Sequence, residues 1–150
     1  MAQTRVSLLV HVVFSTKNRA SLISAEIEAE LFAYIGGIIR TFDSKLLWAN
    51  GTANHIHLLI SLSKNVLLPK LIGDVKRSSS KWIKTKGGLL QKFDWQDGYS
   101  AFSVGHLQQE LVMRYIERQK DHHRKMVFED EMRGFYRKYD IQFDERYVWD

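Results

Sequence analysis

The chain has 150 residues, 45% of them hydrophobic and 26% charged, a balance that predicts one globular domain over residues 1–150. It contains no cysteine, which excludes a disulfide framework and any thiolate metal site, so a bound metal would need nitrogen and oxygen ligands. The formal net charge of +5 favours a polyanionic partner.

The first predicted element is a β-strand within residues 4–16. Positions 6–14 form an almost continuous apolar run, which is typical of a central strand buried on both faces. His11 interrupts this run and shares a strand face with apolar neighbours. That position favours a structural role, and it also allows a place beside histidines of a neighbouring strand.

A helix over residues 25–42 and a β-hairpin are predicted next. Ser24 can cap the helix, and apolar residues recur along it with the helical period, so we expect it to pack on a sheet. The hairpin joins a strand over residues 44–50 to a strand over residues 54–62 through a short turn that contains Gly51.

The second hairpin strand carries the motif His55-Ile56-His57. Strand side chains alternate between faces, so both histidines point the same way and Ile56 points into the opposite layer. Two imidazoles one strand repeat apart can bind one divalent metal ion, and a sheet face leaves coordination positions open for a substrate. The alternative is a pair of hydrogen-bonded structural histidines.

An amphipathic helix is predicted from about residue 68 to 85, with Pro69 in its first turn. No acidic residue follows Asp74 within it, so its polar face should carry charge of a single sign. Such a face is typical of phosphate binding, although a merely solvated helix face fits too. The residues of this face that we expect to contact nucleic-acid phosphates are Lys76, Arg77, Lys81 and Lys84.

A loop over residues 87–98 and a short strand over residues 101–104 come next. Trp95 within the loop is expected to cover the core, with stacking on exposed bases as the alternative. A long helix is predicted from about residue 106 to 125, followed by a short helix over residues 128–139 and an aromatic tail.

The predicted order β-α-β-β-α-β-α indicates an α+β fold. We expect a ferredoxin-like split βαβ antiparallel sheet with helices on one face and an added C-terminal helix that carries catalytic residues. No apolar run approaches the ~20 residues that span a bilayer, and no signal-peptide pattern is present, so a cytoplasmic location is expected.

The long helix carries an unusual polar stripe. At about 100° per residue, Tyr115, Gln119 and His122 lie on one side of it. Together with the His55-Ile56-His57 motif, this pattern resembles the HUH single-tyrosine transposases, small bacterial insertion-sequence enzymes that move as single-stranded DNA. Two further similar stretches are residues 13–19 and 95–104.

The resemblance implies a metal-dependent transposase in which Tyr115 attacks DNA. A 5′-phosphotyrosine would form and a 3′-hydroxyl would be released, and a second transesterification would join a new end. His55 and His57 would bind Mg²⁺ or Mn²⁺, with the amide oxygen of Gln119 as a third ligand; Zn²⁺ fits the same ligands. His122 and His123 would support this site or contact phosphate, unless they form a solvated helix end.

The expected partner is single-stranded DNA, particularly the hairpin ends of the chain's own element. The resemblance adds Lys17 and Arg19 as phosphate contacts. It also implies a homodimer with shared sites, in which Tyr115 and Gln119 of one chain complete the histidine pair of the other. Two alternatives stay open, namely a metal-dependent single-strand nickase and a ferredoxin-like nucleic-acid-binding protein without catalysis.

Overall fold

A four-stranded antiparallel sheet forms the centre of the protein, for which a computed structural model describes residues 2–150. The strands are hydrogen-bonded in the order β2-β3-β1-β4. A helix connects β1 to β2 and another connects β3 to β4, and in each case one other strand lies between the two connected strands. Their bounds are β1 Leu9–Ser15, β2 Lys45–Gly51, β3 His55–Ser61 and β4 Ser100–Val104. This is the split βαβ arrangement, and the predicted ferredoxin-like α+β fold is confirmed.

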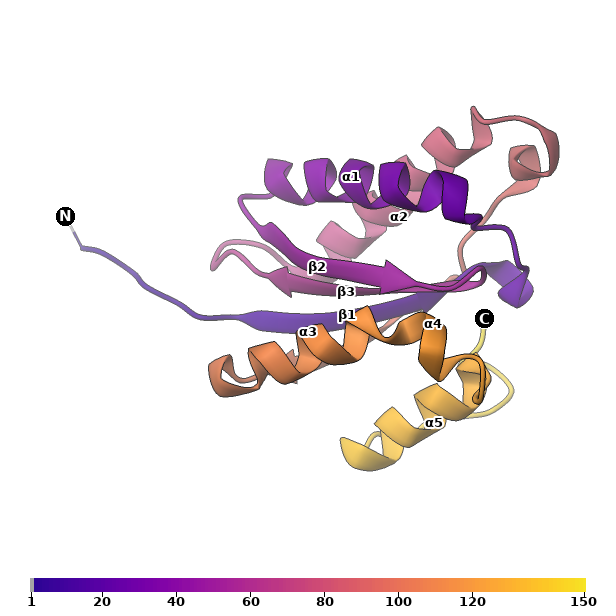
Figure 1. Cartoon of the computed structure of the whole chain (residues 1–150). Helices are drawn as coiled ribbons and strands as arrows, with labels where there is room; N and C mark the ends of the chain where they lie inside the picture. Colours follow the sequence, from indigo (N-terminus) through magenta and orange to yellow (C-terminus); the bar gives the residue numbers. More distant parts are fainter. Residues whose placement is uncertain (1) are drawn as a thin grey trace.

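Helices cover both faces of the sheet (Figure 1). On one face lie the two crossover helices, α1 (Ala25–Thr41) and α2 (Leu68–Lys84). The added C-terminal helices lie on the other face, namely α3 (Gln109–Glu117), α4 (Gln119–His122) and α5 (Phe128–Lys138). Short 3-10 turns occupy Lys17–Arg19, Gly88–Lys92 and His106–Gln108. Within residues 2–150, every helix is too short or too polar to cross a membrane.

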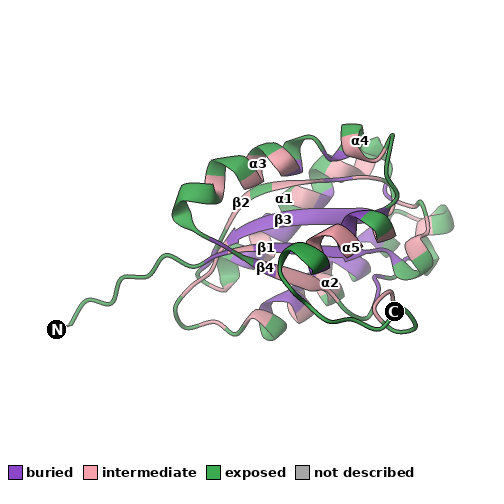
Figure 2. Ribbon diagram, turned by 90° about the horizontal axis from the view of Figure 1, so that it is seen from below, coloured by how far each residue is buried: buried purple, intermediate pink, exposed green. Residues whose placement is uncertain are grey.

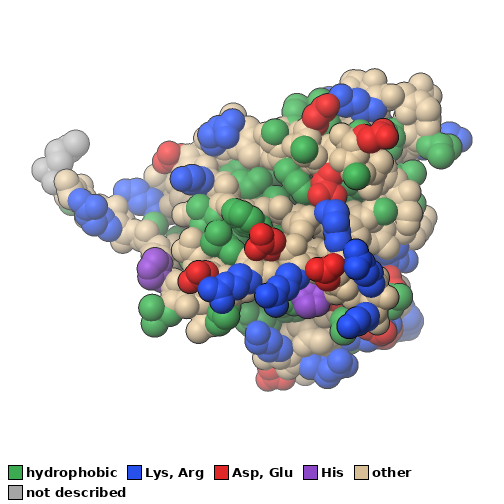
Figure 3. Space-filling model, viewed as in Figure 1, with side chains coloured by type: hydrophobic (Ala, Val, Ile, Leu, Met, Phe, Trp, Pro, Cys, Tyr) green, Lys and Arg blue, Asp and Glu red, His purple; other side chains and the backbone are tan. Residues whose placement is uncertain are grey.

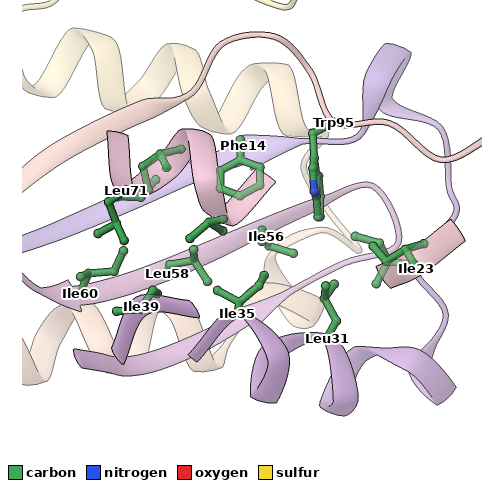
Figure 4. Packing of buried hydrophobic residues seen from close by; sticks show 14 of the residues in the cluster. Phe14, Ile23, Leu31, Ile35, Ile39, Ile56, Leu58, Ile60, Leu71 and Trp95 are labelled. Atoms are coloured by element: carbon green, nitrogen blue, oxygen red, sulfur yellow. The ribbon is translucent and has the colours of Figure 1, made fainter. Parts of the chain in front are cut away.

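Strands β1 and β3 are buried on both faces, as the apolar run in β1 predicts. Side chains alternate along a strand, so every second residue faces α1 and α2. This side of the sheet holds the larger hydrophobic core, where strand and helix side chains meet (Figure 4). Its fully buried members include Val12, Phe14, Leu31, Ile35, Ile39, Ile56, Leu58, Ile60, Leu71 and Ile72.

The other set of strand side chains is covered by α3, α4 and α5 (Figure 2). On this side Val13 of β1 and Phe102 of β4 pack with apolar residues of α5. His11, His55 and His57 are buried on the same side, although imidazoles are polar. Buried polar groups need hydrogen-bond partners, so the layer between the sheet and the added helices must supply them.

The first strand is shorter than the predicted residues 4–16. It begins at Leu9, which pairs with Ser61 of β3 on one side and Val104 of β4 on the other. Residues 2–8 extend beyond both neighbouring strands and are exposed. Apolar sequence alone does not make a strand where no neighbour accepts its backbone hydrogen bonds.

The long helix predicted from residue 106 to 125 is interrupted. Arg118 stands between α3 and α4 with φ −93° and ψ 14°, outside the helical range. Asn50 of β2 explains the break, because its Nδ2 donates to the carbonyls of Ile116 and Glu117, each at 3.0 Å. In a continuous helix those carbonyls would accept from the amides four residues later.

Candidate active site

His55 and His57 lie on the same face of β3, as strand alternation predicts, and both are fully buried. Nδ1 of His55 lies 2.8 Å from Oδ1 of Asn54 and 2.9 Å from the hydroxyl of Thr52. The hairpin turn therefore fixes the orientation of the His55 ring. Ile56, between the two histidines, belongs to the core on the opposite side.

Gln119 and Tyr115 reach the histidines from the two sides of the helix break. Gln119 begins α4 and is fully buried, and its Oε1 lies 3.1 Å from Nε2 of His55. Tyr115 of α3 is half-buried, with its ring centroid 5.9 Å from that of His57. A single chain thus brings together the four residues predicted as nucleophile and metal ligands.

Glu131 of α5 is the residue on which these groups converge, and we did not predict it. Its Oε1 lies 3.1 Å from Nε2 of His57 and 3.5 Å from Nε2 of His55. Its Oε2 accepts one hydrogen bond from Nε2 of Gln119 at 2.9 Å and another from the hydroxyl of Tyr115. One carboxylate oxygen therefore faces the histidines and the other faces Tyr115 and Gln119.

The sequence contains only a weak signal for Glu131. Helix α5 buries Phe128, Met132 and Tyr136, which are spaced by one helical turn. Glu131 lies three residues after Phe128, so the same period turns it toward the sheet. A carboxylate on the buried face of a helix needs a buried partner. The linear sequence does not show that this partner is a histidine pair on β3.

His11 extends the cluster into β1. In the sheet register His11 pairs with Leu59, which makes it the diagonal neighbour of His57 on the same face. Nε2 of His11 and Nδ1 of His57 are 2.7 Å apart and share one proton. His11 therefore supports the ring of His57 from the side opposite Glu131.

The two histidines at the end of α4 contact different parts of the site. Nε2 of His123 lies 3.0 Å from Oε1 of Glu131, and its ring centroid is 4.3 Å from that of His55. The ring of His122 packs on Tyr115 with a centroid separation of 4.8 Å. Both side chains are partly buried against site residues.

Burial sets the protonation of the site. It lowers the pKa of His11 to about 3 and that of His57 to about 4, so both imidazoles are neutral near pH 7. Burial alone would raise the pKa of Glu131, but hydrogen bonds with the surrounding histidines, first His123, hold this pKa below its usual range. Burial and the Glu131 charge raise the pKa of Tyr115, whose hydroxyl therefore keeps its proton.

The donor atoms fit a divalent metal ion. One nitrogen each of His55 and His57 and one oxygen of Glu131 lie within 4.8 Å of one another. Oε1 of Gln119 adjoins the same group through His55. A neutral imidazole and an ionised carboxylate are the forms that bind cations, and the pKa shifts of His57 and Glu131 favour these forms.

Comparison with known proteins identifies the family. The sequence matches the family described as "Transposase IS200 like" over residues 4–119, which is most of the chain. The chain belongs to the IS200-like transposases. These are the single-tyrosine HUH enzymes, and the predicted resemblance is confirmed. No curated protein matches the chain at a significant level.

Two solved structures share the fold of this IS200-like transposase. A candidate transposase from Deinococcus radiodurans R1 aligns with a TM-score of 0.62 and 20% identity, covering 79% of this chain and 98% of that one. A REP-associated tyrosine transposase bound to a REP hairpin aligns with a TM-score of 0.62 and 15% identity, covering 82% and 74%. At these identities the comparison establishes a common fold only.

Lys17 and Arg19 follow β1 and are expected to contact DNA phosphates. In the structure both lie near acidic side chains. Nζ of Lys17 is 3.5 Å from a carboxylate oxygen of Asp97, and both side chains are largely exposed. Arg19 donates to the carbonyl of Trp149 at 2.8 Å and pairs with Glu129 at 3.2 Å. Arg19 thus joins α5 and the C-terminal tail to the turn after β1.

Lys76 of α2 anchors the loop that leads to β4. Its ammonium donates to the carbonyls of Gln96 at 2.8 Å, Asp97 at 3.0 Å, and Gly98. Burial lowers the pKa of Lys76 to about 8, against the opposing effect of nearby aspartates. Trp95 of the same loop is buried in the core, as expected. A phosphate would compete with three carbonyls for this ammonium.

An open hollow of about 410 Å³ is lined by Arg77, Lys81 and Lys84 of α2. Arg77 pairs with Asp74 at 2.6 Å, whereas Lys81 and Lys84 form no ion pair within residues 2–150. Asp94 and Asp97 line the opposite side of the hollow. Along α2 itself no acidic residue follows Asp74, as predicted, but the loop after α2 folds back and brings Asp94 and Asp97 beside the basic residues.

Basic and acidic side chains also alternate over α3 and α4 (Figure 3). Arg114 pairs with Glu110 at 3.0 Å, and Lys120 pairs with Glu28 of α1 at 2.8 Å. Exposed pairs of this kind contribute only about 0–1 kcal/mol each to stability. Because acidic side chains lie beside the basic ones, this face attracts a polyanion less strongly than the basic residues alone would.

Proposed function

We propose that this transposase cleaves and rejoins single-stranded DNA through a 5′-phosphotyrosine at Tyr115, acting as one domain over residues 1–150. The observation that carries the proposal is the position of the Tyr115 hydroxyl, which donates to the same Glu131 carboxylate that meets His57. A phenol beside a carboxylate and a metal-ligand constellation has an acceptor for its proton at the point of attack. Membership of the IS200-like family supports this assignment.

In the proposed reaction, the phenolic oxygen of Tyr115 attacks the scissile phosphorus. The bond between tyrosine oxygen and phosphorus forms as the bond to the 3′ oxygen breaks. The phenolic proton passes to Oε2 of Glu131, and the leaving oxygen takes a proton from solvent to become a 3′-hydroxyl. Attack of a DNA 3′-hydroxyl on the phosphotyrosine reverses these steps, so rejoining needs no ATP.

His55, His57 and Glu131 would hold the divalent ion, with Gln119 adding an amide oxygen. When bound, Mg²⁺ or Mn²⁺ supplies positive charge against the charge that develops on the phosphate. The hydrogen bond that Nδ1 of His55 donates to Oδ1 of Asn54, and the one between His11 and His57, keep the ligand rings oriented before any ion binds.

The proposed DNA substrate is single-stranded with hairpin ends. The relative that was solved with a REP hairpin supports this choice. Lys81 and Lys84 have free ammonium groups for phosphate within the described residues, and Arg77, Lys17 and Arg19 would have to exchange their acidic partners for phosphate.

We further propose a homodimer, in which two equivalent sites could act on two DNA ends. Sharing of sites between subunits would require α3 and α4 to move to the partner. In the single chain, Asn50 and Lys120 hold these helices in place, because Lys120 donates to Oδ1 of Asn50 at 2.8 Å. Sharing therefore requires these hydrogen bonds to break and to form again across the interface.

The nucleophile is tested with Tyr115→Phe and a matched control, Tyr34→Phe, on the outer side of α1. Labelled single-stranded DNA from the sequence flanking the protein's own gene is incubated with each protein and Mn²⁺, then separated on a denaturing gel. We expect a covalent protein–DNA band with the parent and with the control, and none with Tyr115→Phe. Cleavage by Tyr115→Phe at the parental rate would refute the assignment.

A further inference from the structure

We propose that a trench between α3 and α5 holds nucleotides of the single-stranded substrate next to the scissile phosphate. This inference rests on the function proposed above and adds a binding site to it. The trench has a volume of about 620 Å³ and is open to solvent. Figure 2 shows the sheet and the two helices, α3 and α5, whose residues line the trench.

The trench leads to the nucleophile. Tyr115 lines it from α3 and Glu131 from α5, while His11 and Ser103 contribute to its floor on the sheet. The Tyr115 hydroxyl and the Glu131 carboxylate are hydrogen-bonded to each other at this end. A phosphate attacked by Tyr115 would therefore have its neighbouring nucleotide at the mouth of the trench or inside it.

The walls suit nucleotides. Phe135 and Tyr139 lie along the α5 side with nearly parallel rings, their centroids 6.5 Å apart at an interplanar angle of 19°. Tyr139 is 38% exposed, so part of its ring is available to stack on a base. Arg137 and Lys138 also line the trench, and within residues 2–150 neither forms an ion pair. Of the two acidic residues in the lining, Asp130 pairs with Arg133 at 2.8 Å and Glu131 meets the histidines, so a base and its phosphate would meet an aromatic wall and these two cations.

Gly134 keeps the trench open from the middle of α5. A Cβ built at this glycine meets no atom within 4 Å. Glycine inside a helix is unfavourable relative to alanine, and here no close packing requires it. The missing side chain instead leaves space between Tyr115 and Tyr139, which is what an occupant from outside the chain would need.

A second copy of the chain is the competing occupant. Leu111 and Met126 line the trench and are 58% and 47% exposed, which would also suit an apolar helix. The continuity with Tyr115 favours a polyanion, as do Arg137 and Lys138, because these cations lack ion-pair partners within residues 2–150 whereas both carboxylates of the lining are engaged. The opposite result in the test below would identify the second copy.

Gly134→Met tests the proposal, because methionine is a good helix former and its Cβ would meet no atom within 4 Å, which leaves its flexible side chain to extend into the trench. The matched control is Gly37→Met on α1, where a new Cβ would meet only the flexible end of Arg40, at 3.7 Å. Affinity for a short fluorescent single-stranded oligonucleotide is measured by anisotropy in chelator, so that cleavage does not interfere. Circular dichroism and thermal unfolding verify the fold of each variant.

We expect Gly134→Met to bind about tenfold more weakly or worse, as for the loss of one stacked base, and Gly37→Met to bind like the parent. Equal affinity of all three folded proteins would overturn the inference. An unchanged affinity together with a loss of dimer in sedimentation would assign the trench to a second copy, which also overturns it.

Two further measurements keep the test decisive. Should Gly134→Met fail to fold, the exposed double variant Arg137→Gln with Lys138→Gln replaces it. We expect this variant to lower the slope of log affinity against log salt concentration by about two phosphate contacts, and an unchanged slope would refute the inference. The covalent-adduct assay is run in parallel. If the parent and folded Gly134→Met form the adduct equally, the inference about the trench is overturned and the proposed chemistry stands. If the parent forms no adduct, the proposed chemistry is overturned, and the binding measurement still decides whether the trench holds nucleotides.

Discussion

Acid should destabilise the metal-free protein through the two buried imidazoles of His11 and His57. Both rings are at most 2% exposed, and burial lowers the pKa of His11 to about 3 and of His57 to about 4. In the unfolded chain both histidines titrate near 6.5. Below that value the unfolded state binds more protons than the folded state, so stability is full above pH 6.5 and falls as the pH approaches the folded pKa values.

The size of the effect follows from the proton linkage. Each such group costs about 1.4 kcal/mol of unfolding free energy per pH unit below its unfolded pKa. Between about pH 7 and about pH 5 this amounts to about 2 kcal/mol for each histidine, or about 4 kcal/mol together. Since a domain of this size has roughly 5–15 kcal/mol in total, the loss is a large fraction of its stability.

Urea unfolding at both pH values, in chelator, measures this loss directly. His11→Gln removes one of the two groups and should reduce the pH dependence by about half. His106→Gln is the matched control, because His106 is exposed and does not contact the cluster. A parent protein with the same unfolding free energy at pH 7 and pH 5, or a His11→Gln variant with the parental pH dependence, would refute the reasoning.

Four other predictions concern the site and its partners. Glu131→Gln should weaken Mn²⁺ binding about 10–100-fold in calorimetry, and unchanged affinity would remove Glu131 from the metal site. Lys81→Ala should weaken binding of all single-stranded sequences alike and lower the salt slope by about one contact; a sequence-selective loss would argue against a phosphate contact. Asn50→Ala removes the hydrogen bonds to two carbonyls between Tyr115 and Gln119, so cleavage should fall more than DNA affinity. A larger loss of affinity than of cleavage would contradict a role of Asn50 in positioning Tyr115 and Gln119. Mixing Tyr115→Phe with His57→Ala chains should restore cleavage if subunits share sites, whereas an inactive, verified heterodimer would assign each site to one chain.

Most elements of the fold could be predicted because each depends on local pattern. The alternation in β3 placed His55 and His57 on one face, and the structure has both buried there. The helical period along α1 and α2 predicted their packing on the sheet, and turn residues at the hairpin predicted its position. These signals lie within a few residues of each other, where backbone periodicity determines which side chains share a surface.

The site also contains residues that local pattern could not relate. Glu131 lies far from the histidine motif in the chain, and only the covering of the sheet by α5 brings it there. For His11 the sequence allowed either a structural role or a place beside these histidines, and the pairing of β1 with β3 puts it beside His57. The break between α3 and α4 depends on Asn50, a residue of a distant strand, so the helical pattern predicted a continuous helix there.

The sequence by itself thus determined the family, the sheet, and the identity of the nucleophile and histidine candidates, because these depend on short-range periodicity and on motif order. Only the tertiary structure decided that a buried carboxylate lies between Tyr115 and His57, that acidic residues lie beside the basic side of α2, and that a trench leads to Tyr115. Each of these depends on which distant segments meet, and that is determined by burial of the two faces of the sheet as a whole.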